Sequence, residues 1–356
     1  MLTDRTTLTQ FLIEERRRHP DASGELNALI LDVALACKAI SRAVARGALD
    51  GVLGADAAAN AAAEAPKKLE AVASELFLRS NEWGGHLAGM VADAMQAPYA
   101  IPAKYPKGRY LLVFDPLDGS PDIDVDVTVG SIFSILRAPR SHGDAEAEDF
   151  LQPGQRQVCA GYAIYGPSTM LVLTVGTGVH GFTLDPVLGE FFLTHPELRI
   201  PAATCEFAIN ASNSRFWEPA VKRYVEECLA GKSGPRGKDF SMRWIASLVA
   251  ETHRILLRGG VFLDPRDTRE PGNPGRLQQL FETNPIGFIV EQAAGRASAG
   301  RAGALDAPPG SLHQRTGFIF GSRDEVERIE RYHRDHNLRE YDAPLFGARG
   351  LFRAAV

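Results

Sequence analysis

The first part of the chain alternates between polar stretches and apolar residues at helical spacing. Residues 1–22 are polar apart from an apolar patch at 8–13, which predicts an arm ahead of the folded body. Between residues 26 and 44 apolar side chains recur every three or four positions. Ser23 is a suitable N-cap for this segment and Glu25 stands in its first turn, so the pattern predicts a long amphipathic helix.

The next hundred residues begin with two low-contrast segments. The Ala-rich stretch 55–65 predicts a loop that enters a second helix ending near residue 78, because alanine is the strongest helix former. The Gly- and Pro-rich stretch 80–108 predicts a long loop around a short helix at 87–95.

From residue 110 the pattern changes to short apolar runs separated by Gly and Pro turns. The run 110–114 predicts a buried strand. The later runs predict an antiparallel meander, with strands at 127–138, 157–165, 169–175, 179–184 and 190–194.

Beyond Pro201 strands and helices alternate. The helices are predicted at 217–229, 242–257, 285–294 and 322–336, and the strands at 207–210, 260–263 and 317–320. Ser322 and Glu325 have the spacing of a capping box, and the Gly/Ala-rich stretch 293–305 predicts a turn. This change of pattern divides the chain into two α/β halves, 1–200 and 201–356, and a cleft between such halves is a preferred ligand site.

Composition restricts the class of protein. The 356 residues are 45% apolar and 23% charged, with a net charge of −5, which describes a globular chain without an electrostatic case for nucleic acid. No apolar run approaches the length of a membrane span. The 4 cysteines include no C-x-x-C pair, so buried, reduced thiols and a cytoplasmic location are expected.

The chemistry of the chain is concentrated in the stretch 114–124, F-D-P-L-D-G-S-P-D-I-D. The strand at 110–114 delivers Asp115 to its carboxyl end, where Pro116 is expected to end the ladder because it has no N–H group. Asp118 opens a turn in which Gly119 allows a positive φ and Ser120 can cap the segment that follows. Carboxylates and a carbonyl that converge in this way suit Mg²⁺ or Mn²⁺.

D-P-L-D-G-S resembles the signature of the Mg²⁺-dependent, lithium-sensitive sugar and inositol phosphatases. Further stretches resemble class I fructose-1,6-bisphosphatase: 79–90, 207–213, 237–258, 281–295 and 312–315 (L-H-Q-R). The resemblance implies a layered α-β-α-β-α sandwich and a homotetramer. It also implies hydrolysis of fructose 1,6-bisphosphate by metal-activated water, in gluconeogenesis or a carbon-fixation cycle.

The resemblance assigns roles to individual residues. The implied metal ligands are Asp93, Asp115, the Leu117 carbonyl, Asp118 and Glu282, and the implied catalytic carboxylates are Glu64, Glu70 and Asp93. The implied contacts to the sugar phosphates are Asp118, Gly119, Ser120, Asn210, Arg276 and, from a neighbouring subunit, Arg243. Without the resemblance, Arg243 would be interpreted as a helix-surface charge.

Several active-site positions depart from the family pattern. The second carboxylate after Asp93 is replaced by Ala94, and removing a general base is typically worth roughly 10²–10⁴ in rate. The other departures are Glu70, Pro121, Asn213, Trp244, Asp264 and the pair Gln278-Gln279. They leave three alternatives open: a fructose bisphosphatase, a sedoheptulose 1,7-bisphosphatase, and a weakened paralogue that binds sugar phosphates.

An AMP-inhibited site is also implied by resemblance. Ser23, Gly24 and Glu25 match a segment whose helix N-terminus holds the nucleotide phosphate, and Arg109 and Tyr110 match the pair that completes the site. The same residues equally suit an ordinary helix cap beside a strand edge.

Overall fold

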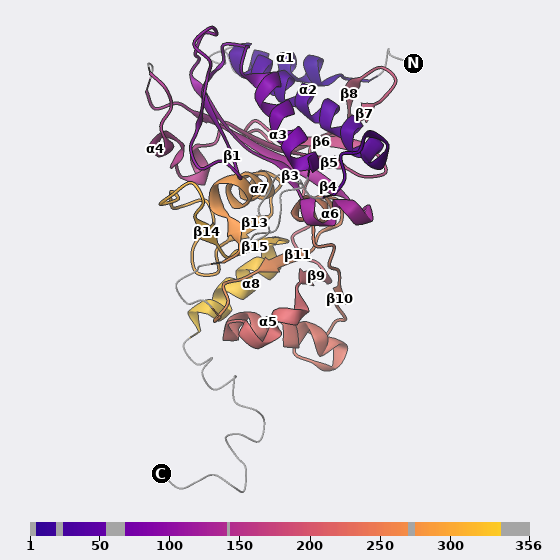
Figure 1. Cartoon of the computed structure of the whole chain (residues 1–356). Helices are drawn as coiled ribbons and strands as arrows, with labels where there is room; N and C mark the ends of the chain where they lie inside the picture. The colour runs from indigo at the N-terminus through magenta and orange to yellow at the C-terminus, as the bar shows by residue number, and fades with distance from the viewer. Residues whose placement is uncertain (1–4, 19–23, 55–67, 141–142, 270–274, 336–356) are drawn as a thin grey trace, which may run out of the picture.

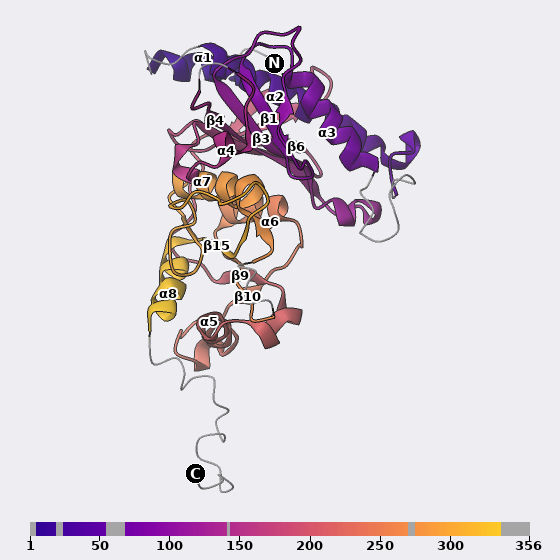
Figure 2. The ribbon, with the colours of Figure 1, turned by 60° about the vertical axis from the view of Figure 1, so that its left-hand side comes forward.

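The computed structural model describes residues 5–18, 24–54, 68–140, 143–269 and 275–335. Three layers of helices alternate with two sheets along the long axis of the molecule (Figures 1 and 2). The predicted α-β-α-β-α sandwich is therefore confirmed.

The outer helical layer of the N-terminal part consists of α1 (Leu8–Arg18), α2 (Gly24–Arg46) and α3 (Lys68–Asn81). Their apolar faces pack on one face of the larger sheet; Phe77 and Phe114, for example, stack with ring centroids 4.7 Å apart. The predicted helix after Ser23 is present as α2. The arm predicted at 1–22 is wrong within its described part, because the patch at 8–13 belongs to α1 and is buried against the sheet.

The larger sheet has the strand order β2-β1-β3-β4-β5-β6-β7-β8. Its strands are β1 (Leu87–Ala92), β2 (Tyr99–Ala100), β3 (Tyr110–Asp118), β4 (Val129–Arg137), β5 (Cys159–Tyr165), β6 (Thr169–Thr174), β7 (His180–Asp185) and β8 (Glu190–His195). β3 to β8 form the predicted antiparallel meander, whereas β1 pairs with β3 in parallel. The helix predicted at 87–95 is wrong. All residues of β1 are buried, and a strand buried on both faces lacks the alternation that separates strand from helix.

The smaller sheet has the order β10-β9-β11-β15-β13. Its strands are β9 (Glu206–Ile209), β10 (Ser241–Met242), β11 (Val261–Asp264), β13 (Arg296–Ser298) and β15 (Phe318–Gly321). β13 lies in the stretch that the sequence predicted to be a turn; it pairs with β15, so that prediction is wrong.

Helices cover both faces of the smaller sheet. The inner pair, between the sheets, is α6 (Leu248–Arg258) and α7 (Asn284–Gln292), and the outer pair is α5 (Pro219–Leu229) and α8 (Arg323–Arg334). α6 begins later than the predicted residue 242, because Ser241–Met242 pairs with β9 and Ser247 caps the helix by accepting the Ala250 N–H at 3.3 Å.

The remaining short elements connect these layers. They are α4 (Ala147–Phe150), the 3₁₀ turns η1 (Gly47–Asp50), η2 (Ser120–Val125), η3 (Gly154–Arg156), η4 (Ala211–Phe216) and η5 (Gly231–Ser233), the π turn η6 (Gln279–Thr283), and the two-stranded pair of β12 (Leu277–Gln278) with β14 (Arg315–Thr316).

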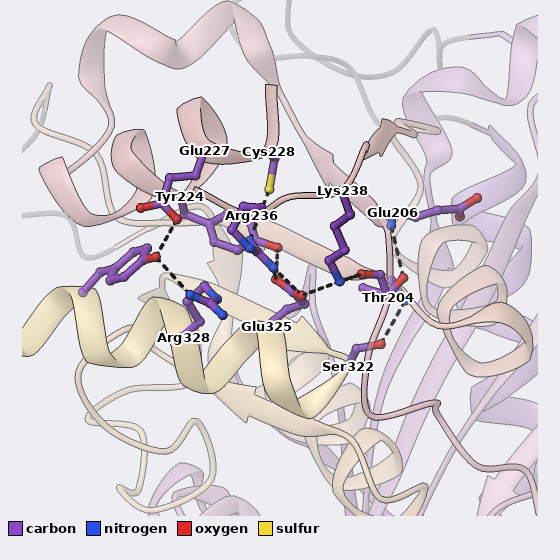
Figure 3. A network of polar contacts seen from close by, with 12 residues as sticks. Thr204, Glu206, Tyr224, Glu227, Cys228, Arg236, Lys238, Ser322, Glu325 and Arg328 are labelled. Carbon is purple, nitrogen blue, oxygen red and sulfur yellow. Dashed lines mark hydrogen bonds and ion pairs between the residues drawn. The ribbon is translucent and has the colours of Figure 1, made fainter. Parts of the chain in front are cut away.

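The capping box predicted at the start of α8 does not form. Ser322 Oγ accepts the Gly260 N–H at 3.2 Å, and Glu325 instead receives two bonds of 2.6 Å from Arg236 (Figure 3). A long-range ion pair therefore replaces the local cap.

Three cysteines, Cys37, Cys159 and Cys228, are buried free thiols as predicted, whereas Cys205 is exposed. Among the described helices, none has the length and apolar character needed to cross a membrane.

Candidate active site

The acidic motif lies at the end of β3, an interior strand of the larger sheet. Asp115 and Asp118 are each only 8% exposed. The prediction that Pro116 ends the strand is wrong: β3 runs to Asp118, and its pairing with β4 shifts register between Asp115 and Asp118. Such a bulge accommodates a proline that cannot donate to the ladder. The Leu117 N–H donates to Asp115 Oδ1 at 3.0 Å, which fixes the first carboxylate.

The turn after the strand has the predicted backbone at Gly119, with φ of 81°. Gly119 is itself the N-cap of η2, and no side chain caps that turn, so the capping role predicted for Ser120 is wrong. Pro121 occupies the first turn of η2, where its missing N–H group costs no helical hydrogen bond.

Asp118 is held by the N-terminus of α6, from the other half of the chain. Its Oδ2 accepts the Val249 N–H at 2.9 Å and the Ser247 hydroxyl at 3.2 Å. A carboxylate is favoured there by the helix dipole and the unsatisfied N–H groups. No local sequence pattern predicts this contact, because Ser247 and Asp118 are 129 residues apart.

Three further acidic residues approach the end of β3. Asp93 follows β1, where its N–H donates to the Phe114 carbonyl at 3.2 Å. Glu70 stands in the first turn of α3, and Glu282 lies in η6 with its Oε2 accepting the Gln278 N–H at 2.5 Å. β1, β3, α3 and η6 thus each bring an acid to one region.

Burial and mutual repulsion disfavour the charged forms of these acids. Burial, then Glu70, raises the pKa of Asp93 to about 6. Burial raises the pKa of Asp118 to about 6 and that of Glu282 to about 8, and it raises the pKa of Asp115 well above its usual value. Asp93, Asp118 and Glu282 add further repulsion at Asp115. The site therefore favours the binding of a cation.

The donor set fits a hard divalent cation. Asp93 Oδ1 is buried and has no hydrogen-bond partner among the described residues, so one carboxylate oxygen is directed away from protein donors. In the described part of the chain, however, no three His, Cys, Asp or Glu side chains are arranged to hold a metal as they stand. Coordination by several of these carboxylates therefore requires their side chains to move together.

A second pocket lies at the carboxyl ends of β9 and β11. Its lining combines apolar residues, such as Trp217, with the polar residues Asn210, Asn213, Asp264, Asp267 and Arg276. The side-chain Oδ1 of Asn210 accepts the Ser212 N–H at 3.1 Å, which leaves the side-chain Nδ2 to donate to an anion. Arg276 lies 3.6 Å from Asp267.

The predicted contact residue Arg243 and the departure Trp244 lie outside that pocket. Arg243 follows β10 rather than standing on a helix, and its side chain is 57% exposed, with Nε 3.6 Å from Glu206. Trp244 is partly exposed and stacks on Phe262 at 5.9 Å. The described chain alone therefore does not bring Arg243 into the pocket with Arg276.

Two residues of the implied AMP site, Glu25 and Arg109, meet at the start of α2. Arg109 forms an ion pair of 2.8 Å with Glu25, beside Gly24 at the helix start. Tyr110 is buried, and the Arg137 guanidinium lies 5.8 Å from its ring centroid. Ser23 and the catalytic candidate Glu64 lie outside the described residues.

A layered α/β molecule with clustered carboxylates at a strand end and a separate pocket bearing an arginine and amides has the features of a phosphoric monoester hydrolase. Comparison with known proteins gives the particular family. Residues 6–196 match the model for the fructose-1,6-bisphosphatase N-terminal domain, and residues 200–334 match that for the C-terminal domain. The chain belongs to the fructose-1,6-bisphosphatase family.

The relatives are similar over nearly their whole length. Fructose-1,6-bisphosphatase class 1 3 of Methylibium petroleiphilum is 65% identical over 99% of this chain and 98% of its own length. Fructose-1,6-bisphosphatase class 1 of Hydrogenophilus thermoluteolus is 65% identical over 98% of this chain and 97% of its own. The holo crystal structure of Leishmania major fructose-1,6-bisphosphatase superposes with a TM-score of 0.85 at 35% identity, covering 93% of this chain and 99% of that one.

Proposed function

We propose that this protein hydrolyses fructose 1,6-bisphosphate to fructose 6-phosphate and phosphate, in gluconeogenesis or a carbon-fixation cycle. The observation that carries the proposal is the group formed by Asp93, Asp115, Asp118 and Glu282, whose pKa values burial raises. Within the described residues none of these acids forms an ion pair with a Lys, Arg or His side chain. The positive charge that would neutralise these carboxylates is therefore left to a ligand.

The cation that this site would hold is Mg²⁺, with Mn²⁺ able to substitute. Asp93, Asp115, Asp118, the Leu117 carbonyl and Glu282 are the groups that would hold it. When bound, such a cation neutralises phosphate charge and lowers the pKa of a coordinated water.

The protein's own residues supply orientation and proton handling. Gly119 and Ser120, with the backbone N–H groups of the turn, would face the phosphate that is removed. Asp93, with Glu70 within electrostatic reach, would accept the proton of the attacking water. Water attacks the phosphorus directly, so no covalent intermediate with the chain is required.

The second phosphate would bind in the pocket of Asn210 and Arg276, with Arg243 reaching it from a neighbouring subunit of a homotetramer. The acids in this pocket favour one alternative, sedoheptulose 1,7-bisphosphate, because Asp264 and Asp267 can accept hydrogen bonds from additional sugar hydroxyls. Relative turnover of the two bisphosphates separates these substrates.

Phosphate release from fructose 1,6-bisphosphate with Mg²⁺, by the native chain and by Ala94→Glu, tests the proposal. Ala94 is exposed beside Asp93, so a glutamate can be accommodated there. Turnover by the native chain supports the bisphosphatase. Activity that appears only in Ala94→Glu indicates a weakened paralogue, and silence in both proteins contradicts the proposal.

AMP would bind at the start of α2, where its phosphate would compete with Glu25 for Arg109. Inhibition by AMP in the native enzyme, lost in Arg109→Ala, supports this site, and a flat response removes it. The free thiols also support a reducing, cytoplasmic location.

A further inference from the structure

Asp93 and Glu282 come from segments nearly two hundred residues apart, and one histidine joins these segments. His313 Nε2 lies 2.8 Å from the Met95 carbonyl, two residues beyond Asp93. Its Nδ1 lies 2.9 Å from Oε1 of Gln278. Gln278 is the residue whose N–H donates to Glu282, so the imidazole connects the Asp93 turn to the backbone that holds Glu282.

The ring is fixed on its face as well as at both nitrogens. It stacks on Phe281 with centroids 5.7 Å apart, and Phe281 immediately precedes Glu282. Phe281 and Leu312 are buried in an apolar cluster with Val91, from the strand that leads to Asp93. The histidine therefore lies on packed elements that support both acids.

The proton arrangement at His313 keeps both polar contacts. A carbonyl oxygen only accepts, so Nε2 carries a hydrogen and donates to Met95. If the ring is neutral, Nδ1 accepts a hydrogen bond from the NH₂ group of the Gln278 side chain; if the ring is protonated, Nδ1 donates to the Gln278 side-chain oxygen. Both contacts are satisfied in either case.

We propose that His313 is a positioning residue that sets the separation of Asp93 and Glu282, so that both acids reach the same divalent cation. The imidazole touches neither of these acids directly and acts through Met95 and Gln278. This inference rests on the proposed function only in its assumption that the acids bind a metal. Substitution of a residue that orients a metal ligand without contacting the metal typically changes metal affinity by about 10–100-fold.

Two substitutions separate the polar contacts from the packing. His313→Phe keeps a ring against Phe281 and removes both hydrogen bonds. His313→Gln offers one donor and one acceptor, so it can restore both bonds without a ring. His180→Phe is the matched control, because His180 is also buried and packs on an aromatic ring, Phe11 at 4.6 Å, but on strand β7 at the far side of the larger sheet.

The readout is Mn²⁺ binding to the full chain without substrate, followed by electron paramagnetic resonance, together with the temperature of unfolding. Asp118→Asn identifies the signal that comes from the site. We expect His313→Phe to bind Mn²⁺ about 10–100-fold more weakly, His313→Gln to recover most of that loss, and His180→Phe to bind as the native chain does.

Native Mn²⁺ affinity in folded His313→Phe would overturn the inference, as would an equal loss in His180→Phe. If His313→Phe does not fold, Gln278→Ala decides, since it removes one bond to His313 and leaves the backbone N–H on Glu282; native affinity there overturns the inference too. Failure of the native chain to bind Mn²⁺ would instead contradict the metal role in the proposed function, which keeps the two failures distinct.

Discussion

Asp115 and Glu325 are both buried carboxylates, but their surroundings differ. Glu325 and Arg236 form an ion pair of 2.6 Å with side chains 3% and 4% exposed, and Tyr224 donates a further hydrogen bond at 2.9 Å (Figure 3). Asp115 is surrounded by other acids, and burial raises its pKa. A buried charge that the protein itself neutralises is a structural element, whereas a group of buried charges of one sign requires a ligand.

The ion pair of Arg236 with Glu325 also holds the outer helices α5 and α8 together. Arg236, from the loop after α5, binds Glu325 of α8, and Lys238 Nζ lies 3.7 Å from the same acid while donating to the Thr204 carbonyl at 2.9 Å. Tyr332 donates to Glu227 at 2.5 Å. This network joins α5, α8 and the segment that leads to β10, and so it supports the strand that precedes Arg243.

The largest effect is expected at Glu282. Glu282→Gln keeps the side-chain shape and removes the carboxylate that would hold the cation. The loss of several kcal/mol of metal-linked stabilisation should lower kcat by about 10³-fold, while the metal-free protein should unfold at the same temperature or higher. Steady-state phosphate release and thermal unfolding in EDTA measure these effects. A variant that keeps a tenth of native activity would show that Glu282 is not needed.

Glu325→Gln should give the opposite result. Removing one partner leaves Arg236 buried and uncompensated, so the free energy of unfolding should fall by about 3–5 kcal/mol, with kcat of the folded protein unchanged. Denaturant unfolding measures this, and Asp324→Asn, exposed in the same turn of α8, should stay within about 0.5 kcal/mol of native. Equal losses in the two variants would mean that the ion pair has no special role.

The same contrast shows what the sequence could predict. The meander, α2 and the acidic strand end follow from local periodicity and turn residues. The capping box at Ser322 failed because a partner 89 residues away from Glu325 competes for that side chain. The same limit applies to Ser247 on Asp118 and to His313, whose carbonyl partner is 218 residues away. Local rules identify Asp115 and Asp118, and the family resemblance adds Asp93 and Glu282. Only the packed tertiary structure shows which buried acids are neutralised.

His253 avoids the cost of burial in a third way, by remaining neutral. Burial lowers its pKa to about 4, and its Nδ1 lies 2.9 Å from the Tyr162 hydroxyl. Below pH 6.5 His253 is protonated in the unfolded chain but remains neutral in the folded protein until the pH approaches 4. The contribution of His253 to the free energy of unfolding is therefore complete above pH 6.5 and falls toward pH 4. The loss should be at most about 3 kcal/mol. Urea unfolding of the native chain and His253→Gln at pH 7 and 4.5 isolates it; parallel losses would contradict it.

The smallest effect is expected in the pocket of Asn210 and Arg276. This pocket is intermediate between the neutralised Glu325 and the acidic group around Asp115, because it contains both acids and an arginine. Burial raises the pKa of Asp264 to about 6, so its carboxylate is charged at pH 8 and largely protonated at pH 5. Asp264→Asn should therefore strengthen binding of fructose 6-phosphate about fivefold at pH 8, equivalent to about 1 kcal/mol, and change it little at pH 5.

Asp267 provides the matched comparison in the same pocket. Its hydrogen bond with Arg269 lowers its pKa, so it stays charged at both pH values, and the effect of Asp267→Asn should not depend on pH. Calorimetric titration of the three proteins at pH 5 and pH 8 measures the ratios, and the ionisation of the ligand cancels because each protein meets the same ligand. A pH-independent ratio for Asp264→Asn would mean that Asp264 is neutralised by Arg276, which would place this pocket with the Arg236–Glu325 network rather than with the acidic group.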